Sequence, residues 1–357
     1  MSPTPSVSGV HQPYKLIVAI DYGTTYTGIS YVTSNKTSDD IVIVTRWPNH
    51  RDQSWKAPSI LAYASENQQK ISRNHWGYEC TRGLKQYAWT KLLLDQHVRL
   101  TEHDDPLLRQ MYGAEGFLGL PPNKTAEDVV ADFMTEVYRH TMQILERDFA
   151  QILRYLPIEV WVTMPAIWSD AAQNATREAA LRAGFGSRPG DSVKMITEPE
   201  AAALWALKPY LGPTALDPLK PGEYVLICDC GGGTVDLITY EILTVTPHLT
   251  HREKCVGTGA KCGATAIDRA FVQWMEAKFG EAYIALDAKK RGPGSLFMQS
   301  FESHKRNFGD RSDERDVFEI GPIQLDLDVA SIKYDEDEQV VKVARYTKLR
   351  LDDRSTD

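Results

Sequence analysis

Two stretches of this chain follow one plan: VAIDYGTTYTGIS at residues 18–30 and LICDCGGGTVDLI at residues 226–238. Each reads as an apolar strand that ends in an acid, a turn of glycine and threonine, and a second strand. Asp21 and Asp229 hold the same place in the two stretches. The repeat therefore predicts two β-hairpins of the same design, one in each half of the chain.

The residues of the two turns are suited to phosphate. Glycine lets an anion approach the backbone N–H groups and accepts positive φ, and threonine adds hydroxyl donors. The turn residues are Gly23, Thr24, Thr25, Gly231, Gly232, Gly233 and Thr234. Asp21 and Asp229 carry carboxylates, which are ligands that hydrated Mg²⁺ prefers. Two facing hairpins of this kind predict a clamp for a Mg-nucleotide, with ATP as the expected ligand.

Composition excludes several classes of protein. The 357 residues carry a net charge of −8, which argues against a protein that coats nucleic acid. No apolar run is long enough to cross a membrane. Residues 1–13 are rich in serine and proline and predict a disordered tail rather than a signal peptide. We therefore expect no nucleic-acid partner, no membrane partner, and a cytoplasmic or nuclear location.

The five cysteines do not suggest a disulfide framework, because their number is odd in a long chain. They are Cys80, Cys228, Cys230, Cys255 and Cys262. A structural zinc is the alternative to weigh, but Cys-x-Cys is not the usual knuckle spacing and no paired histidines accompany it. Small buried thiols in a reducing compartment are the favoured interpretation.

The chain divides into two predicted lobes, each opening with one of the hairpins. The first covers 14–207, with an inserted subdomain at about 64–124. A linker rich in proline and glycine follows at 208–222, and the second lobe covers 223–348 before a charged tail at 349–357. A ligand is expected in the cleft between the lobes.

Helix and strand signals fill in this plan. Thr125 and Asp128 resemble a capping box, Ser169 can cap a helix over 170–183 that Gly184 ends, and Pro199 suits the first turn of a helix over 201–207. Further helices are predicted at 265–279 and 295–308, and strands at 14–33, 159–164, 193–197, 323–329 and 341–343.

Rival phosphate motifs fail. The chain has no Gly-x4-Gly-Lys-Ser/Thr loop and no Gly-x-Ser-x-Gly elbow. Residues 257–263 superficially resemble a dinucleotide fingerprint, but the third glycine is one place late and no apolar strand leads directly into it.

Three motifs in order resemble the nucleotide-binding domain of the 70-kDa heat-shock chaperone family. They are Asp-x-Gly-Thr-Thr-Tyr at 21–26, Thr-Glu-Pro-Glu-Ala-Ala-Ala at 197–203, and Asp-x-Gly-Gly-Gly-Thr-x-Asp at 229–236. The segment 76–79 is similar to the divergent 12A-like branch, of fungal type. The resemblance covers about 14–330. It implies an α/β, actin-like ATPase (ribonuclease H-like) fold with two lobes around a nucleotide cleft.

The resemblance also implies roles for individual residues. Asp21 and Asp229 would hold Mg²⁺ through water, and Glu198 and Asp236 would orient the attacking water or accept its proton, with Thr234 beside them. The phosphates of ATP or ADP would be bound by Gly23, Thr24, Thr25, Tyr26, Gly231, Gly232, Gly233 and Thr234. Glu302, Lys305 and Arg306 match the adenosine-contacting triad of the family. Without the family, these three read as an ordinary charged helix face.

The chain departs from the family pattern in two places. Counting from Gly77, the position of the catalytic lysine falls on Thr81, next to Arg82, while Lys85 and Lys91 are off register. A missing cation there would weaken turnover more than binding. No second glycine-rich loop follows Arg306, so we expect a shortened second lobe and no peptide-binding domain.

Several functions remain open at this point. The first is an ATP-binding protein with ATP-driven lobe closure and a chaperone-type role, whose partners would be clients or co-chaperones. The second is a nucleotide-dependent interaction module that does not hydrolyse ATP. The third is an actin-like sugar or acetate kinase, against which the Thr-Glu-Pro-Glu and Glu-x-x-Lys-Arg motifs weigh. The fourth is a truncated product that binds nothing.

Overall fold

The computed structural model describes residues 14–81, 83–95, 99–108, 119–212, 215–255, 257–308, 316–328 and 331–344. The expected tails at 1–13 and 349–357, and Arg82, lie outside these ranges.

The first sheet contains the first hairpin. Its strands are β1 (Leu16–Tyr22), β2 (Tyr26–Thr33), β3 (Val42–Ile43), β4 (Ala57–Pro58), β8 (Ile158–Met164) and β9 (Ser192–Thr197). The order is β3-β2-β1-β8-β9, with β4 also paired to β2. β1 runs antiparallel to β2 and parallel to β8. The predicted strands around the first turn are confirmed.

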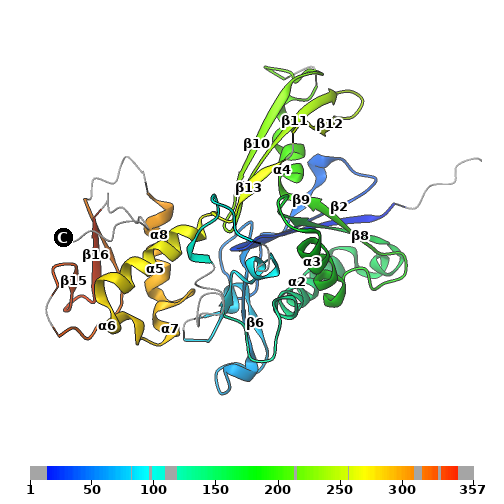
Figure 1. The fold of residues 1–357 in the computed structure, drawn as a ribbon. Helices are drawn as coiled ribbons and strands as arrows, with labels where there is room; N and C mark the ends of the chain where they lie inside the picture. The colour runs from blue at the N-terminus through cyan, green and yellow to red at the C-terminus, as the bar shows by residue number, and fades with distance from the viewer. Residues whose placement is uncertain are drawn as a thin grey trace, which may run out of the picture.

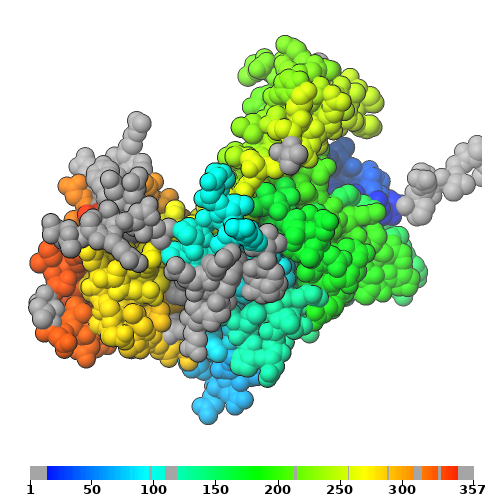
Figure 2. Space-filling view, viewed as in Figure 1, coloured from blue at the N-terminus to red at the C-terminus, as the bar shows by residue number. Residues whose placement is uncertain are grey.

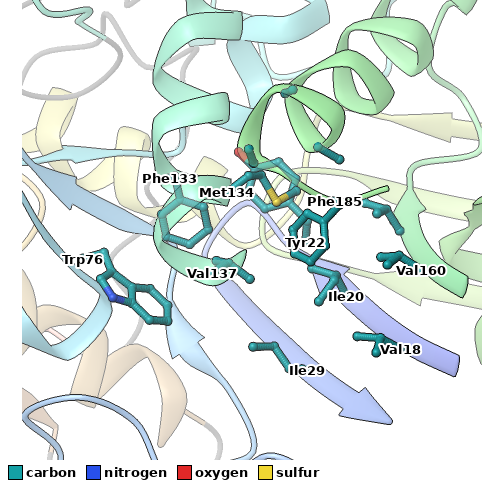
Figure 3. Packing of buried hydrophobic residues seen from close by; sticks show 14 of the residues in the cluster. Val18, Ile20, Tyr22, Ile29, Trp76, Phe133, Met134, Val137, Val160 and Phe185 are labelled. Atoms are coloured by element: carbon teal, nitrogen blue, oxygen red, sulfur yellow. The ribbon is translucent and has the colours of Figure 1, made fainter. Parts of the chain in front are cut away.

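Helices α2 (Ala126–Phe149) and α3 (Asp170–Ala183) share a core with this sheet (Figure 1). Thr125 and Asp128 form the predicted capping box of α2, Ser169 caps α3, and Gly184 ends α3 with φ of +114°. Figure 3 shows Tyr22 of β1 close to Phe133 of α2, with ring centroids 5.8 Å apart. This packing fixes the strand that carries Asp21.

The second sheet contains the second hairpin. Its strands are β10 (Tyr224–Cys230), β11 (Val235–Thr244), β12 (Thr250–Glu253) and β13 (Thr258–Ala260), and every pairing is antiparallel. α4 (Glu198–Ala206) packs on one face of this sheet through Ala203. The helix begins three residues before the predicted start at 201 and ends one residue before the predicted end at 207. The sheet projects from the rest of the molecule (Figures 1 and 2).

A third unit of helices and a small sheet follows. It comprises α5 (Thr265–Phe279), α6 (Glu281–Ile284), α7 (Ala288–Arg291), α8 (Leu296–Arg306), β14 (Val317–Ile320), β15 (Tyr334–Asp335) and β16 (Val340–Ala344). The predicted strand over 323–329 is wrong: the strand lies earlier, at β14, and residues 321–328 form no ladder. Ile323 and Leu325 are nevertheless buried, so apolar alternation here reflects core packing without strand pairing. Pro322, which has no backbone N–H, lies two residues after the end of β14.

The remaining elements are short. They are β5 (Ile60–Ala62), β6 (His75–Trp76) and β7 (Tyr87–Ala88) in one small sheet, and the 3₁₀ turns η1 (Ser38–Asp40), η2 (Ala64–Glu66), η3 (Gly77–Glu79), η4 (Thr90–Asp95), η5 (Ala150–Tyr155) and η6 (Lys208–Tyr210). Two buried ion pairs connect the segment 95–105 to later parts of the chain. Asp95 pairs at 2.7 Å with Lys261, which follows β13, and Asp105 pairs with Arg269 of α5.

We expected buried thiols, and for four of the five cysteines this prediction is wrong. Cys228, Cys230, Cys255 and Cys262 are exposed, and Cys80 is intermediate. Cys228 and Cys230 lie on β10, whose residues alternate between exposed and half-buried. The reason is that the second sheet has a helix packed on only one face of β10 among the described residues.

The two hairpins match in register as well as in sequence. Asp21 pairs with Gly28 across the first hairpin, and Asp229 pairs with Asp236 at the same place in the second. Both turns close with the same backbone bond, from Gly23 N to Tyr26 O at 3.1 Å and from Gly231 N to Thr234 O at 2.9 Å. The repeat in sequence is therefore a repeat in backbone structure.

The turns of the two hairpins pack tip to tip. A Cβ placed on Gly232 would lie 2.5 Å from Thr25 Oγ1, and one on Gly233 would lie 2.3 Å from Thr24 Oγ1. These separations are far inside contact distance, so only glycine fits. The packing brings the ends of β1 and β10 together.

The substitution Gly232→Ala tests this contact. We expect a loss of about 1–3 kcal/mol in the free energy of unfolding, measured by urea denaturation, because the added methyl overlaps Thr25. Adding Thr25→Ala removes the two nearest atoms, Oγ1 at 2.5 Å and Cγ2 at 2.7 Å, and should restore part of the loss. Strictly additive effects of the two changes would show that the turns do not touch.

Candidate functional site

Three carboxylates come together where the hairpins meet; we call Asp21, Asp229 and Glu198 the acidic cluster. Asp21 and Asp229 are the penultimate residues of β1 and β10, and Glu198 begins α4 after its N-cap, Thr197. Burial raises the pKa of Glu198, and the charges of Asp21 and Asp229 act in the same direction. Burial, followed by the charge of Asp21, also raises the pKa of Asp229. Cations are therefore strongly favoured here.

A buried lysine supplies one such cation. Lys91, in η4, is 2% exposed and forms an ion pair with Glu198. Its Nζ also donates to the carbonyl oxygen of Tyr22 at 2.6 Å. The attraction of Lys91 lowers the pKa of Glu198, against the larger effect of burial. The ammonium group is thus held between the end of β1 and the start of α4.

The sequence count from Gly77 missed this lysine. Thr81, where the count ends, is exposed, and Lys85 pairs with Glu66 at 2.7 Å, whereas Lys91 reaches the acidic cluster. A signal was present in the sequence: Lys91 stands alone within the apolar run at 88–94. A charge in a buried run needs a partner, and the partner here is Glu198.

Asp21 has two further neighbours. Thr163, at the end of β8, donates from Oγ1 to Asp21 Oδ1 at 3.0 Å. Lys56 Nζ lies 2.5 Å from Asp21 Oδ2, with the lysine side chain 49% exposed. Lys56 follows no motif that sequence reasoning used, and it reaches Asp21 because β4 pairs with β2. The positive charge of Lys56 therefore lies on one oxygen of the Asp21 carboxylate.

Asp236 is buried opposite Asp229. Its Oδ1 accepts a hydrogen bond from the backbone N–H of Ile167 at 3.2 Å, while Oδ2 is buried with no partner among the described residues. Burial raises the pKa of Asp236, and the hydrogen bond from the backbone N–H of Ile167 opposes the shift. An unpaired buried carboxylate oxygen is costly and suits an additional donor, such as a ligand-bound water.

The second turn presents its amides because its carbonyls are already engaged. The backbone N–H groups of residues 263, 264 and 265, at the start of α5, donate to the carbonyl oxygens of Gly233, Gly231 and Gly232 at 2.8–3.0 Å. The amides of Gly232 and Gly233 have no backbone acceptor within the described ranges. Such an arrangement of N–H groups is typical of anion binding.

The third unit reaches the first hairpin through α8. Arg306 donates to the Tyr26 hydroxyl at 2.6 Å and lies 5.0 Å from the centre of its ring. Glu302 pairs with Arg306 at 2.7 Å and with Lys305 at 2.6 Å, so the charged-face interpretation is partly realised. Lys305 also pairs with the buried Asp268 at 2.8 Å. The triad and the first hairpin are therefore neighbours.

The predicted residues thus fall into two groups. The hairpin residues, the acidic cluster and Asp236 lie where the two turns meet. Lys305 instead pairs with Asp268 in the third unit. The pair Asp21 and Asp229 fits Mg²⁺, which uses one or two carboxylates and keeps its waters. Within the described ranges no group of three His, Cys, Asp or Glu side chains could hold a metal directly. In the same ranges no helix has the length and apolar character of a membrane span.

Comparison with known proteins finds similarity to 70-kDa heat-shock proteins. The chain is 25% identical to human heat shock 70 kDa protein 12B over 86% of its own length and 52% of that protein. It is 25% identical to mouse heat shock 70 kDa protein 12A over 83% of its length and 50% of that protein. It is 28% identical to the chaperone protein DnaK of Elusimicrobium minutum over 136 residues, or 38% of this chain and 19% of that one.

No family model matches the chain. The chain spans about half the length of the heat shock 12A and 12B proteins that it matches. The mixed α/β architecture, with several sheets and helices, is consistent with the fold of this family. Over most of its length this chain is similar to the divergent 12A/12B branch of the 70-kDa heat-shock proteins, as its motifs indicate.

Proposed function

We propose that this chain binds Mg-ATP and Mg-ADP between its two hairpins, in an actin-like ATPase (ribonuclease H-like) fold of two lobes. The observation that carries the proposal is the meeting of two matched turns beside the acidic cluster and Lys91. A site for a nucleoside triphosphate requires N–H groups for the phosphates, carboxylates for a hydrated cation and a positive charge near the transferred phosphoryl group.

Each part has a proposed role. The backbone N–H groups and hydroxyls of the two turns bind the phosphate oxygens. Asp21 and Asp229 hold Mg²⁺ through its waters, and the metal neutralises phosphate charge when it is bound. Glu198 orients a water and accepts its proton, a role that its raised pKa suits. Asp236 offers its unpaired Oδ2 to the same water network.

Lys91 favours hydrolysis over the alternative of binding without turnover. Its ammonium is buried beside Glu198, where it can stabilise negative charge on a transferring phosphoryl group. Tyr26 and Arg306 mark the nucleoside end of the site, because they join the first hairpin to the Glu302 helix face. Closure of the lobes around the nucleotide and a chaperone-type role with clients or co-chaperones complete the proposal.

Two variants test the site. Asp229→Ala should lower Mg-dependent ATP affinity by about tenfold or more, because a carboxylate that holds the metal is lost. Lys91→Met should leave affinity within a few fold and slow phosphate release by about 100-fold. Calorimetry measures the first effect and a single-turnover assay with labelled ATP the second.

Asp335→Ala is the matched control, since Asp335 pairs with Lys342 in the sheet of β14–β16. It should change neither quantity. Unchanged affinity in a folded Asp229→Ala protein would refute the hairpin site. Tight binding by the unaltered chain without phosphate release would refute the ATPase. If Lys91→Met unfolds, Glu198→Gln, which keeps the size of the side chain, tests turnover in its place.

Lys56 should compete with the metal for Asp21, because both need the same carboxylate. The exposed pair is worth about 0.2–1 kcal/mol, so Lys56→Gln should tighten Mn²⁺ binding by about 1.5- to 5-fold. Electron paramagnetic resonance of Mn²⁺ in the presence of ADP measures this.

Lys15→Gln is the control for that experiment. Lys15 pairs with Glu159 at 2.5 Å and is 42% exposed, which closely resembles the 2.5 Å pair of Lys56 at 49% exposure. Its removal should leave Mn²⁺ affinity unchanged. Weaker Mn²⁺ binding in Lys56→Gln would contradict the competition and place Lys56 on the nucleotide instead.

A further inference from the structure

Two thiols lie next to the second hairpin turn without a role in the site described above. The Sγ atoms of Cys228 and Cys230 are 3.5 Å apart, and both residues are exposed. They sit two positions apart on β10 and therefore share one face of the strand. Asp229, between them, points to the opposite face. The chain thus places an accessible dithiol on either side of a residue of the acidic cluster.

The strand that carries the dithiol is held on one edge and on one face only. Among the described residues β10 pairs only with β11, so it is an edge strand. Its exposed face also carries Tyr224 and Leu226, which are 56% and 62% exposed. No helix or strand within the described ranges holds this face in place. Within the described ranges, a change in the spacing of Cys228 and Cys230 is therefore opposed by β11 at one edge and by α4 on the face away from the thiols.

We propose that Cys228 and Cys230 form a reversible intramolecular disulfide that acts as a redox switch on the second hairpin. The oxidant is a low-molecular-weight disulfide such as oxidised glutathione. One protein thiolate attacks it and releases one glutathione, leaving a mixed disulfide. The second protein thiolate attacks the mixed disulfide and releases the other glutathione. Two thiol protons are transferred to the released thiolates, and two electrons reduce the glutathione disulfide.

Closing the bond must contract the strand. The two sulfur atoms have to move from 3.5 Å to about 2.05 Å apart. Residues two apart in a strand have Cα atoms about 6.6–6.8 Å apart, at the upper limit of about 6.8 Å for a disulfide. A bond closed under such strain is readily reduced, which is typical of regulatory rather than structural disulfides.

The contraction acts directly on Asp229. Cys228, Asp229 and Cys230 pair in register with Leu237, Asp236 and Val235 of β11. Drawing the two cysteines together changes this register and turns Asp229 away from Asp21. This second step rests on the proposed function, because its consequence is weaker binding of Mg-nucleotide in the oxidised chain.

The experiment equilibrates the full 357-residue chain in defined mixtures of reduced and oxidised glutathione. Free thiols are then alkylated, and intact mass and peptide mapping count and locate them. We expect two thiols to disappear together, with a mass loss of about 2 Da, and to return on reduction. Peptides should assign the bond to Cys228 and Cys230 in a monomeric protein.

Cys228→Ser and Cys230→Ser should each abolish the bond, whereas Cys255→Ser, another exposed cysteine, should leave it intact. Thiols that stay free in oxidising mixtures, a stable glutathione adduct on one cysteine, or a bond between two chains would overturn the disulfide. Because these readouts need no nucleotide, they are independent of the proposed function.

Nucleotide affinity is measured on the same samples. Oxidation should weaken Mg-ATP binding by about tenfold in the unaltered chain, and reduction should restore the affinity. Oxidation should leave the Mg-ATP affinity of the Cys228→Ser variant unchanged. A disulfide that forms without any change in affinity would overturn the switch. If the chain binds no nucleotide in any glutathione mixture, the proposed function and the switch both fail. The disulfide is then judged on the mass result alone.

Discussion

The turn of the second hairpin can lie against the turn of the first only because Gly232 and Gly233 have no side chains. Thr24 and Thr25 fill the space that two methyl groups would need. This contact decides where β1 and β10 end relative to one another, and hence where Asp21 and Asp229 stand. The start of α5 fixes the second turn from behind by binding its three carbonyl groups. These few contacts set the position of the two turns relative to one another.

Such packing concentrates negative charge. Burial raises the pKa values of Glu198 and Asp229; the charge of Asp21 adds to both shifts, and the charge of Asp229 adds to that of Glu198. The chain offsets part of this cost with Lys91 on Glu198 and Lys56 on Asp21. The two lysines differ in kind: Lys91 is buried and tied to the Tyr22 carbonyl, while Lys56 is half-exposed. The cluster therefore combines a buried cation with a solvent-accessible one.

Local features of the sequence predicted the hairpins, the caps of α2 and α3, and most helices, because turn residues, capping boxes and apolar spacing act over a few positions. Lys91 and Lys56 were missed because their partners are distant in the chain and are brought close only by packing. The exposure of Cys228 and Cys230 was also unpredictable, since it depends on what covers β10. At 323–329, alternating apolar residues predicted a strand where the chain buries Ile323 and Leu325 without pairing.

The central claim is that both hairpins bind one ligand. Hydrogen exchange of the backbone amides, with and without Mg-ATP, tests it directly. The account predicts that the amides of residues 23–26 and 231–234 become protected together, at the same ligand concentration and only when Mg²⁺ is present. Protection confined to one hairpin, or to neither while ATP is bound, would contradict it.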